Sequence, residues 1–370
     1  MKHFLIILII STICNIDVGA CTSAIISGRV TANGRPLLWK HRDTSRQDNR
    51  VERIAATDST PEYVALFNAD DTLCREAWIG YNSRGFAVMN TAVYNLKDDT
   101  VTRMDREGML MTEALRRCTT VDDFERLLHD LPKPLGVEAN FGVIDAQGNG
   151  AYFETDNWDY VKYDLADAPD GILVRTNYAH SGRKGEGKGR TREKNALHLL
   201  KPHTAARDVS AELLTETLSR SFYSSRLNKD YTHSEATLQA DQEFIPRPTS
   251  CATVVIEGVT DGENPLLTTM WVGLGYPPCS EIRAAWLGDN GVPVELRVTG
   301  RNGHSPLCDT AITRKSEVFK ANGKIDLGKL YNSHGTGYCQ MLSKRNSDTY
   351  RRGYEAIARK RNQLHGTTAH

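Results

Sequence analysis

Residues 21–39 place the strongest constraint on the fold, because they combine two β-prone runs with a short turn. Residues 22–27 are apolar at their centre and predict a buried strand. A turn at 32–34 and a second strand at 36–39 complete a hairpin. The hairpin carries the residue that precedes it, Cys21, into a sheet.

The first 20 residues have the three-part form of a secretory signal. A basic start is followed by an apolar run over residues 4–16 and by small residues at 18–20. The run is too short to span a bilayer comfortably. The sequence therefore predicts a signal peptide at 1–20 and an exported protein, periplasmic or extracellular, whose mature chain begins at Cys21.

A cysteine in the first position of a mature chain carries a thiol and an α-amine on one residue. Unperturbed pKa values of about 8.5 for the thiol and about 7.7 to 8.0 for the amine make the amine a usable proton acceptor. Removal of the signal would therefore produce a nucleophile and its base in a single cut.

Two other fates of Cys21 compete with a catalytic role. Residues 18–21 also fit a lipoprotein signal, in which Cys21 becomes a membrane anchor and its sulfur is blocked. Cleavage elsewhere would leave an ordinary buried or disulfide-bonded thiol. The buried strand at 22–27 weakens the lipoprotein interpretation, because an anchored domain needs a polar, flexible tether after its cysteine.

The charge balance of the chain argues against polyanionic partners. Lys and Arg number 46, as do Asp and Glu, so the formal net charge is zero. Neither nucleic acid nor an anionic membrane is an expected partner, unless Cys21 is lipidated. The length favours one large domain with an appendage. We expect a catalytic domain at 21–309 and a basic, helical C-terminal extension at 310–370 that packs on it.

Of the eight cysteines, Cys14 leaves with the signal and Cys21 is the candidate nucleophile. The other six could form three disulfides in an oxidising compartment. Their wide spacing and the lack of a CxxC pair predict neither a zinc site nor a particular pairing. These six are Cys74, Cys118, Cys251, Cys279, Cys308 and Cys339.

Apolar periodicity predicts alternating blocks of strands and helices. Strands are predicted at 76–81, 86–90, 140–144, 151–154, 171–177, 252–257, 268–272 and 295–298. Helices are predicted twice within 109–131, with a boundary and cap at 119–123, then at 193–200 and once or twice within 331–361. Asn90 and Asn177 each close an apolar strand.

Several motifs, taken in order, resemble the N-terminal-nucleophile hydrolases that cut linear amide bonds. Cys21-Thr22-Ser23 is similar to the Cys-Thr start of these enzymes, and residues 34–43 are similar to their second strand. That strand ends in Asp43 as in the family, with His41 in place of the usual Asn. Residues 80–88 and Thr176-Asn177 resemble two later segments. The family includes choloylglycine hydrolases, penicillin acylases of that type, isopenicillin N acyltransferases and cysteine dipeptidases.

The resemblance implies an α+β fold, a four-layer αββα sandwich of two antiparallel sheets flanked by helices. It implies Cys21 as nucleophile, Asp43 as anchor of the α-amine, and Asn90 and Asn177 as oxyanion donors. An active-site arginine falls at Arg190 or Arg192, and Arg190 is the preferred candidate. Lys40 or that arginine would favour the thiolate. His41 is expected to be a spectator. No cofactor and no metal are implied.

The leading hypothesis is therefore an amidohydrolase that cleaves a small N-acyl compound through a thioester at Cys21. An acyltransferase or a dipeptidase would use the same nucleophile, and a non-catalytic lipoprotein anchored at Cys21 is a further alternative. The expected partner is a small amide substrate. Self-association into a homo-oligomer is left open.

Overall fold

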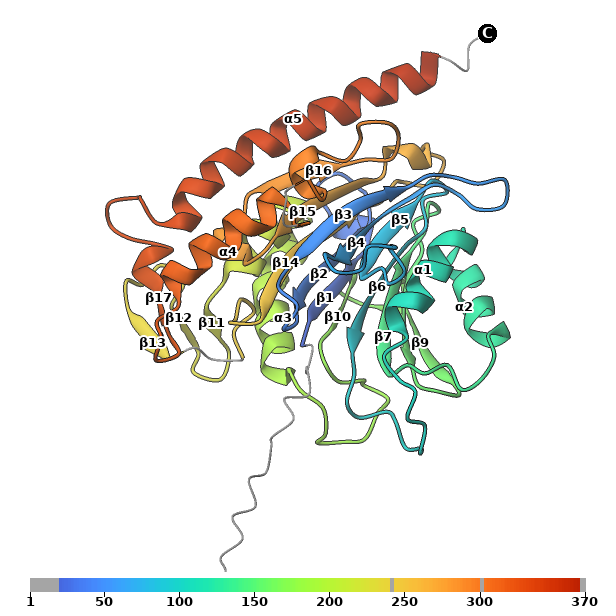
Figure 1. Ribbon diagram of the computed structural model, residues 1–370, viewed down its shortest axis with the longest axis horizontal. Helices are drawn as coiled ribbons and strands as arrows, with labels where there is room; N and C mark the ends of the chain where they lie inside the picture. The colour runs from blue at the N-terminus through green and yellow to red at the C-terminus, as the bar shows by residue number, and fades with distance from the viewer. Residues whose placement is uncertain (1–19, 240–242, 300–302, 367–370) are drawn as a thin grey trace, which may run out of the picture.

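The computed structural model describes the backbone of residues 20–239, 243–299 and 303–366. Within these residues two antiparallel sheets stack face to face, and helices lie on both outer faces (Figure 1). The predicted signal peptide lies outside the described residues except for Ala20.

The first sheet has six strands in the order β10-β1-β2-β14-β15-β16. Its strands are β1 (Thr22–Ile26), β2 (Leu37–Asp43), β10 (Ile172–Arg175), β14 (Ser250–Glu257), β15 (Thr269–Leu274) and β16 (Ile282–Ala285). The predicted hairpin is confirmed, with Ile25 opposite Leu38 in an antiparallel pair. Because β10 and β2 flank β1, the strand that follows Cys21 is an interior strand.

The second sheet is a meander of seven strands in chain order. Its strands are β3 (Asn49–Ile54), β4 (Tyr63–Asn68), β5 (Ile79–Asn82), β6 (Ala87–Ala92), β7 (Ala139–Ile144), β8 (Gly150–Thr155) and β9 (Tyr160–Asp164). Residues 83–86 connect β5 to β6, where Gly85 adopts a φ of 82° that favours glycine. The predicted strands at 140–144 and 151–154 are confirmed.

One apolar layer fills the space between the sheets. Ile25 and Leu38 of the first sheet meet Leu66 and Met89 of the second there. Successive side chains of a strand point to opposite faces, so each sheet also presents an outer apolar face. Both sheets therefore have to be covered by helices on their outer sides.

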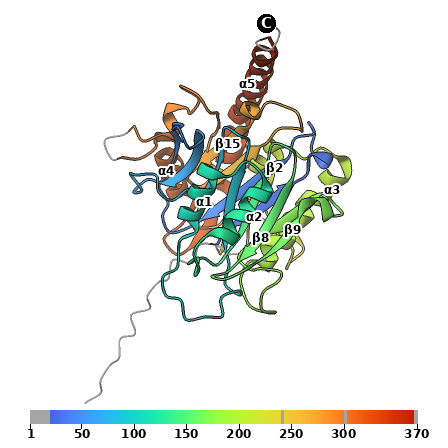
Figure 2. The same cartoon turned by 90° about the vertical axis from the view of Figure 1, so that its right-hand side faces the viewer.

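Two helices, α1 (Glu107–Arg117) and α2 (Val121–Asp130), cover the seven-stranded sheet (Figure 2). They confirm the two helices predicted within 109–131. The predicted cap is also present, because Thr120 and Asp123 satisfy each other's backbone N–H groups in a capping box. Phe124 packs against Phe141 and Phe153 of the sheet.

The six-stranded sheet is covered by α3 (Arg190–Ala206) and by α5 (Tyr338–Gly366). The ring centroids of Trp271 in β15 and Tyr350 in α5 are 4.8 Å apart. The layers therefore run helix, sheet, sheet, helix, which confirms the αββα sandwich. Among the described residues, none of the helices combines the length and apolar character that a bilayer span requires.

The C-terminal segment is built into this body. Helix α4 (Pro306–Val318) begins before residue 310, and β17 (Lys324–Asp326) pairs with β13 (Thr237–Gln239). The remaining short elements are β11 (Tyr223–Ser224), β12 (Lys229–Asp230), η1 (Gly28–Val30), η2 (Leu165–Asp167), η3 (Leu213–Thr217), η4 (Leu218–Arg220), η5 (Pro265–Leu267), η6 (Pro277–Cys279), η7 (Val294–Leu296) and η8 (Leu327–Lys329).

One predicted strand is wrong. Residues 295–298 do not join a sheet, and a 3₁₀ turn covers Val294–Leu296 instead. Pro293 precedes the turn with a φ of −54°, and a proline cannot donate to a sheet ladder. The apolar side chain of Leu296 is buried in the layer between the sheets, which explains the apolar signal in the sequence.

All seven described cysteines are free thiols, so the disulfides that the compartment would permit are absent from this part of the chain. Six of the seven are buried and Cys74 is half-buried. Burial raises the pKa of Cys118 to about 12, which keeps this thiol protonated and unreactive at neutral pH.

Candidate active site

Cys21 lies immediately before β1 with only 7% of its surface exposed. Its Sγ is 4.0 Å from the backbone oxygen of Asp43, at the end of β2. The same oxygen accepts a hydrogen bond from the N–H of Ala20, at 3.1 Å. The first residues of the hairpin are thus held against the end of the neighbouring strand.

Arg192 holds the backbone around Cys21. Its Nη1 donates to the carbonyl oxygen of Cys21 at 2.7 Å and to that of Ala20 at 3.2 Å, and its Nη2 donates to Asn177 Oδ1 at 2.8 Å. Burial, followed by the nearby charge of Arg247, lowers the pKa of Arg192 to about 10. The guanidinium therefore stays charged at neutral pH.

The preferred arginine of the sequence prediction, Arg190, lies elsewhere. It is exposed, donates to the carbonyl of Glu186, and packs over the ring of Tyr178 at 4.0 Å. Both arginines are in the first turn of α3. They are two positions apart in the sequence, which on an α-helix separates their side chains by about 200° around the helix axis. Arg192 consequently points inward to Cys21 while Arg190 points outward.

Asp43 is held by two groups that the sequence prediction missed. Its Oδ1 accepts from the hydroxyl of Ser250, and its Oδ2 accepts from Nε of Arg247 at 3.0 Å. Arg247 also donates through Nη2 to the carbonyl oxygen of Ala20. The carboxylate therefore lies in a buried network beside the Ala20–Cys21 peptide bond.

His41 extends this network. Its Nε2 is 2.9 Å from Ser250 Oγ, which in turn donates to Asp43, so the imidazole donates from Nε2. Its Nδ1 has no hydrogen-bond partner among the described residues. Burial lowers the pKa of His41 to about 4, against the opposing effect of Asp43. His41 is thus a neutral donor that orients Ser250 and Asp43.

We expect stability to fall in mild acid because of His41. In the unfolded chain His41 takes up its proton near pH 6.5, whereas in the folded chain it does so only near pH 4. The neutral, buried His41 therefore contributes its full stability above pH 6.5, and this contribution is lost as the pH falls toward 4. Between pH 7 and 5 this amounts to about 2 kcal/mol of unfolding free energy. Urea unfolding at pH 7 and pH 5 should show that His41→Asn loses less unfolding free energy between these pH values than the wild type does. The control His129→Asn, which replaces an exposed histidine, should lose as much as the wild type.

Lys40 links the two sheets beside the thiol. Its Nζ donates to Asn90 Oδ1 in β6 at 2.7 Å and to the carbonyl oxygen of Trp78 at 2.8 Å. Burial lowers the pKa of Lys40 to about 8, while the charge of Cys21 acts in the opposite direction. The charge of Lys40 and the thiol of Cys21 are therefore close enough to interact inside the protein.

This pKa predicts the alkaline side of the activity profile. If protonated Lys40 supports the thiolate, the rate falls as the pH rises through about 8. Lys40→Arg keeps its charge, so the fall near pH 8 should move to a higher pH. The profile of kcat/KM against pH tests this, with Lys162→Arg as the matched control. A fall that remains near pH 8 in Lys40→Arg would contradict the role of Lys40.

The two asparagines occupy different environments. Asn90 accepts from Lys40 through Oδ1, which turns its Nδ2 away from the ammonium. Asn177 accepts from Arg192 through Oδ1 and donates from Nδ2 to the carbonyl of Ala92 at 2.8 Å. The structure therefore places Cys21, Lys40, Asp43, Asn90 and Asn177 in one connected region and leaves Arg190 outside it.

Three further polar residues belong to this region, and sequence patterns indicated them only weakly. Arg42 lies within the charged run after the second predicted strand, and its guanidinium packs over the ring of Trp78 at 4.9 Å. Arg247 and Ser250 lie just ahead of the strand predicted at 252–257. The one sequence signal that could have identified these residues is that polar side chains flank buried strands.

Comparison with known proteins finds similarity to solved structures at low sequence identity. No protein-family model and no curated protein matches the sequence. The chain is similar to an N-acylethanolamine-hydrolyzing acid amidase ortholog from Caenorhabditis elegans, with 14% identity, a TM-score of 0.45, and coverage of 64% of this chain and 92% of that one.

Two other solved structures are similar at a comparable level. One is a variant of the conjugated bile acid hydrolase from Clostridium perfringens, with 12% identity, 72% and 92% coverage and a TM-score of 0.41. The other is penicillin V acylase from Agrobacterium tumefaciens, with 10% identity, 72% and 86% coverage and a TM-score of 0.39. Because these TM-scores are low, the description of the fold depends on the layers and strand register of this chain and not on the similar structures.

Those layers, with a buried cysteine directly ahead of an interior strand, agree with the αββα sandwich that the resemblance implied.

Proposed function

We propose that the protein is an exported amidohydrolase whose mature chain begins at Cys21 and which cleaves a linear amide bond of a small N-acyl compound. The observation that carries the proposal is the position of Cys21. Its thiol is buried directly ahead of an interior strand and is close enough to Lys40 for the two groups to interact electrostatically. A lipid anchor would also need a flexible tether after its cysteine, whereas the buried strand β1 follows Cys21 directly.

The reaction needs only groups of this chain and water. The Cys21 thiolate attacks the amide carbonyl carbon, the C–N bond breaks, and the leaving amine takes the proton that the α-amine accepted from the thiol. Water then attacks the resulting thioester, which releases the carboxylic acid and restores the thiol. Lys40 supports the thiolate at the start of each cycle.

The neighbours of Ala20 support the α-amine as the base. In the described chain, the carbonyl of Ala20 accepts from Arg192 and from Arg247. Removal of Ala20 would leave the new amine of Cys21 close to both guanidinium groups, which disfavour a further positive charge. Asp43 would orient the amine and offset part of that effect. The amine would therefore remain available as a proton acceptor near neutral pH.

We assign the oxyanion contact to Nδ2 of Asn90. The bond from Lys40 fixes the amide orientation, and a fixed neutral donor suits a developing oxyanion. Asn177 would act with Arg192, because these two side chains are hydrogen-bonded beside Cys21. Loss of one oxyanion donor typically lowers the rate by about a hundredfold to a thousandfold.

Two measurements test the proposal. The intact mass of the exported protein should correspond to an unmodified chain beginning at Cys21, whereas a diacylglyceryl adduct would favour the lipoprotein alternative. The mature protein should then hydrolyse at least one member of a panel of bile-salt conjugates, N-acyl amino acids, penicillins and dipeptides. Adding a nucleophilic amine during turnover separates hydrolysis from acyl transfer.

A further inference from the structure

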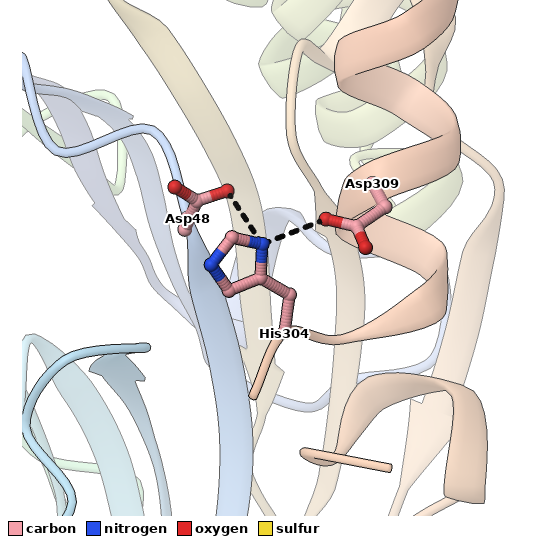
Figure 3. A group of neighbouring side chains, drawn as sticks. All are labelled: Asp48, His304 and Asp309. Carbon is pink, nitrogen blue, oxygen red and sulfur yellow. Dashed lines mark hydrogen bonds and ion pairs between the residues drawn. The ribbon is translucent and has the colours of Figure 1, made fainter. Parts of the chain in front are cut away.

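A second cluster of reactive side chains lies apart from the candidate active site. His304 Nδ1 is 3.1 Å from Asp309 Oδ1 and 3.6 Å from Asp48 Oδ1 (Figure 3). One ligand atom from each residue lies within 4.8 Å of the other two. Figure 3 shows both carboxylates turned toward the same ring nitrogen, so three donor atoms lie close together.

The spacing of these atoms fits a tetrahedral metal ion. Zinc bonds to histidine nitrogen and carboxylate oxygen are about 2.0 to 2.2 Å long, so neighbouring ligands of a tetrahedral site are about 3.4 Å apart. The two distances from His304 Nδ1, 3.1 and 3.6 Å, bracket that value. A proton on Nδ1 forms a good hydrogen bond to one carboxylate, whereas a metal ion can bind all three donors at once.

The donor set selects a class of ion. One imidazole and two carboxylates suit borderline divalent metals such as Zn²⁺, while Ca²⁺ and Mg²⁺ prefer oxygen ligands alone. The three side chains are 34% to 42% exposed, which leaves room for water in the remaining coordination position. A cavity of about 610 Å³, lined by Asp48, His304 and Arg46 among others, gives access from solvent.

Contacts beside the cluster hold its backbone in place without an ion. Cys308 is the residue before Asp309. Its Sγ lies 3.4 Å from the backbone nitrogen of Asn49 and 3.4 Å from the carbonyl oxygen of Gln47. These residues flank Asp48. Ser305, next to His304, caps α4 by accepting from the N–H of Cys308. The ligand positions are therefore set by the fold, which lowers the cost of ordering them on binding.

We propose that Asp48, His304 and Asp309 form a binding site for Zn²⁺ or a similar divalent transition metal, which ties the start of α4 to the loop between β2 and β3. The site departs from the expectation that the protein binds no metal. Its ligands come from segments more than 250 residues apart in the sequence, so metal binding would stabilise the attachment of the C-terminal segment to the sheets.

Titration with zinc sulfate tests this proposal on the full mature chain, without a histidine tag. The Cys21→Ser background removes the thiol that, together with the α-amine, could otherwise bind Zn²⁺. We expect one Zn²⁺ per chain by calorimetry, a rise in Tm with added Zn²⁺, and little response to Mg²⁺. His304→Ala and Asp48→Asn should each weaken binding by at least about a hundredfold.

The matched control is His203→Ala, which removes a histidine that pairs with a single carboxylate, Asp208, at 2.8 Å. This variant should bind Zn²⁺ as the parent does. Absence of binding by the parent protein would overturn the proposal, as would equal affinity in folded His304→Ala. Circular dichroism checks that each variant is folded, and the readout does not depend on amide cleavage.

Discussion

Replacement of Cys21 by serine is expected to leave a folded protein whose turnover is at least about a thousandfold lower than that of the wild type. Serine has nearly the same volume, so the start of β1 should remain packed. Its hydroxyl is far less ionised than a thiol at neutral pH, so the buried cation Lys40 cannot produce a comparable nucleophile. Single-turnover rates with an active substrate from the panel measure the loss.

The control for this experiment is Cys74→Ser. Cys74 is half-buried, and its Sγ accepts from Arg50 at 3.4 Å, well away from the candidate site. Its replacement should change turnover by less than about twofold. Near-normal turnover of Cys21→Ser would show that the nucleophile lies elsewhere. Unfolding of Cys21→Ser, followed by circular dichroism, would instead indicate a structural role for the thiol.

Arg192→Met is expected to reduce both stability and turnover strongly, whereas Arg190→Met should be close to the wild type in both. Arg192 is buried and, in a chain that begins at Cys21, still donates to the carbonyl of Cys21 and to Asn177 Oδ1. Its loss leaves buried acceptors without a donor, at a cost of about 3 kcal/mol. We expect turnover to fall by about a hundredfold, because Cys21 and Asn177 lose their shared support.

Arg190 is the matched control because it lies two residues away on the same helix. Its exposed side chain packs on Tyr178, and its replacement should change stability by less than about 0.5 kcal/mol. Urea unfolding and kcat/KM for both variants provide the comparison. Equal effects of the two substitutions would contradict the assignment of Arg192 to the site.

Local sequence patterns predicted much of the fold. The hairpin of β1 and β2 followed from β-prone runs around a turn, and the start of α2 followed from its cap. The strand predicted at 295–298 is wrong, because Leu296 belongs to a short 3₁₀ turn and its side chain is buried from there. Short apolar runs do not by themselves distinguish a buried strand from a buried turn.

The candidate site was predictable where its residues lie on or beside predicted strands. Cys21, Lys40 and Asp43 belong to one hairpin, so their proximity follows from strand pairing. The choice between Arg190 and Arg192 was not predictable, because it depends on the rotation of α3 about its own axis. Arg247 reaches Asp43 only through the pairing of β14 with β2, which joins segments about 200 residues apart.

The sequence by itself determined that a β-hairpin follows Cys21 and that blocks of strands and helices alternate along the chain, because strand and helix periodicities are local properties. The tertiary structure alone decided that Arg192 and Arg247 reach the backbone beside the thiol, and that Asp48, His304 and Asp309 lie together. The physical reason is that these contacts depend on strand order, helix rotation and loop packing, which arise when distant segments bury their apolar faces together.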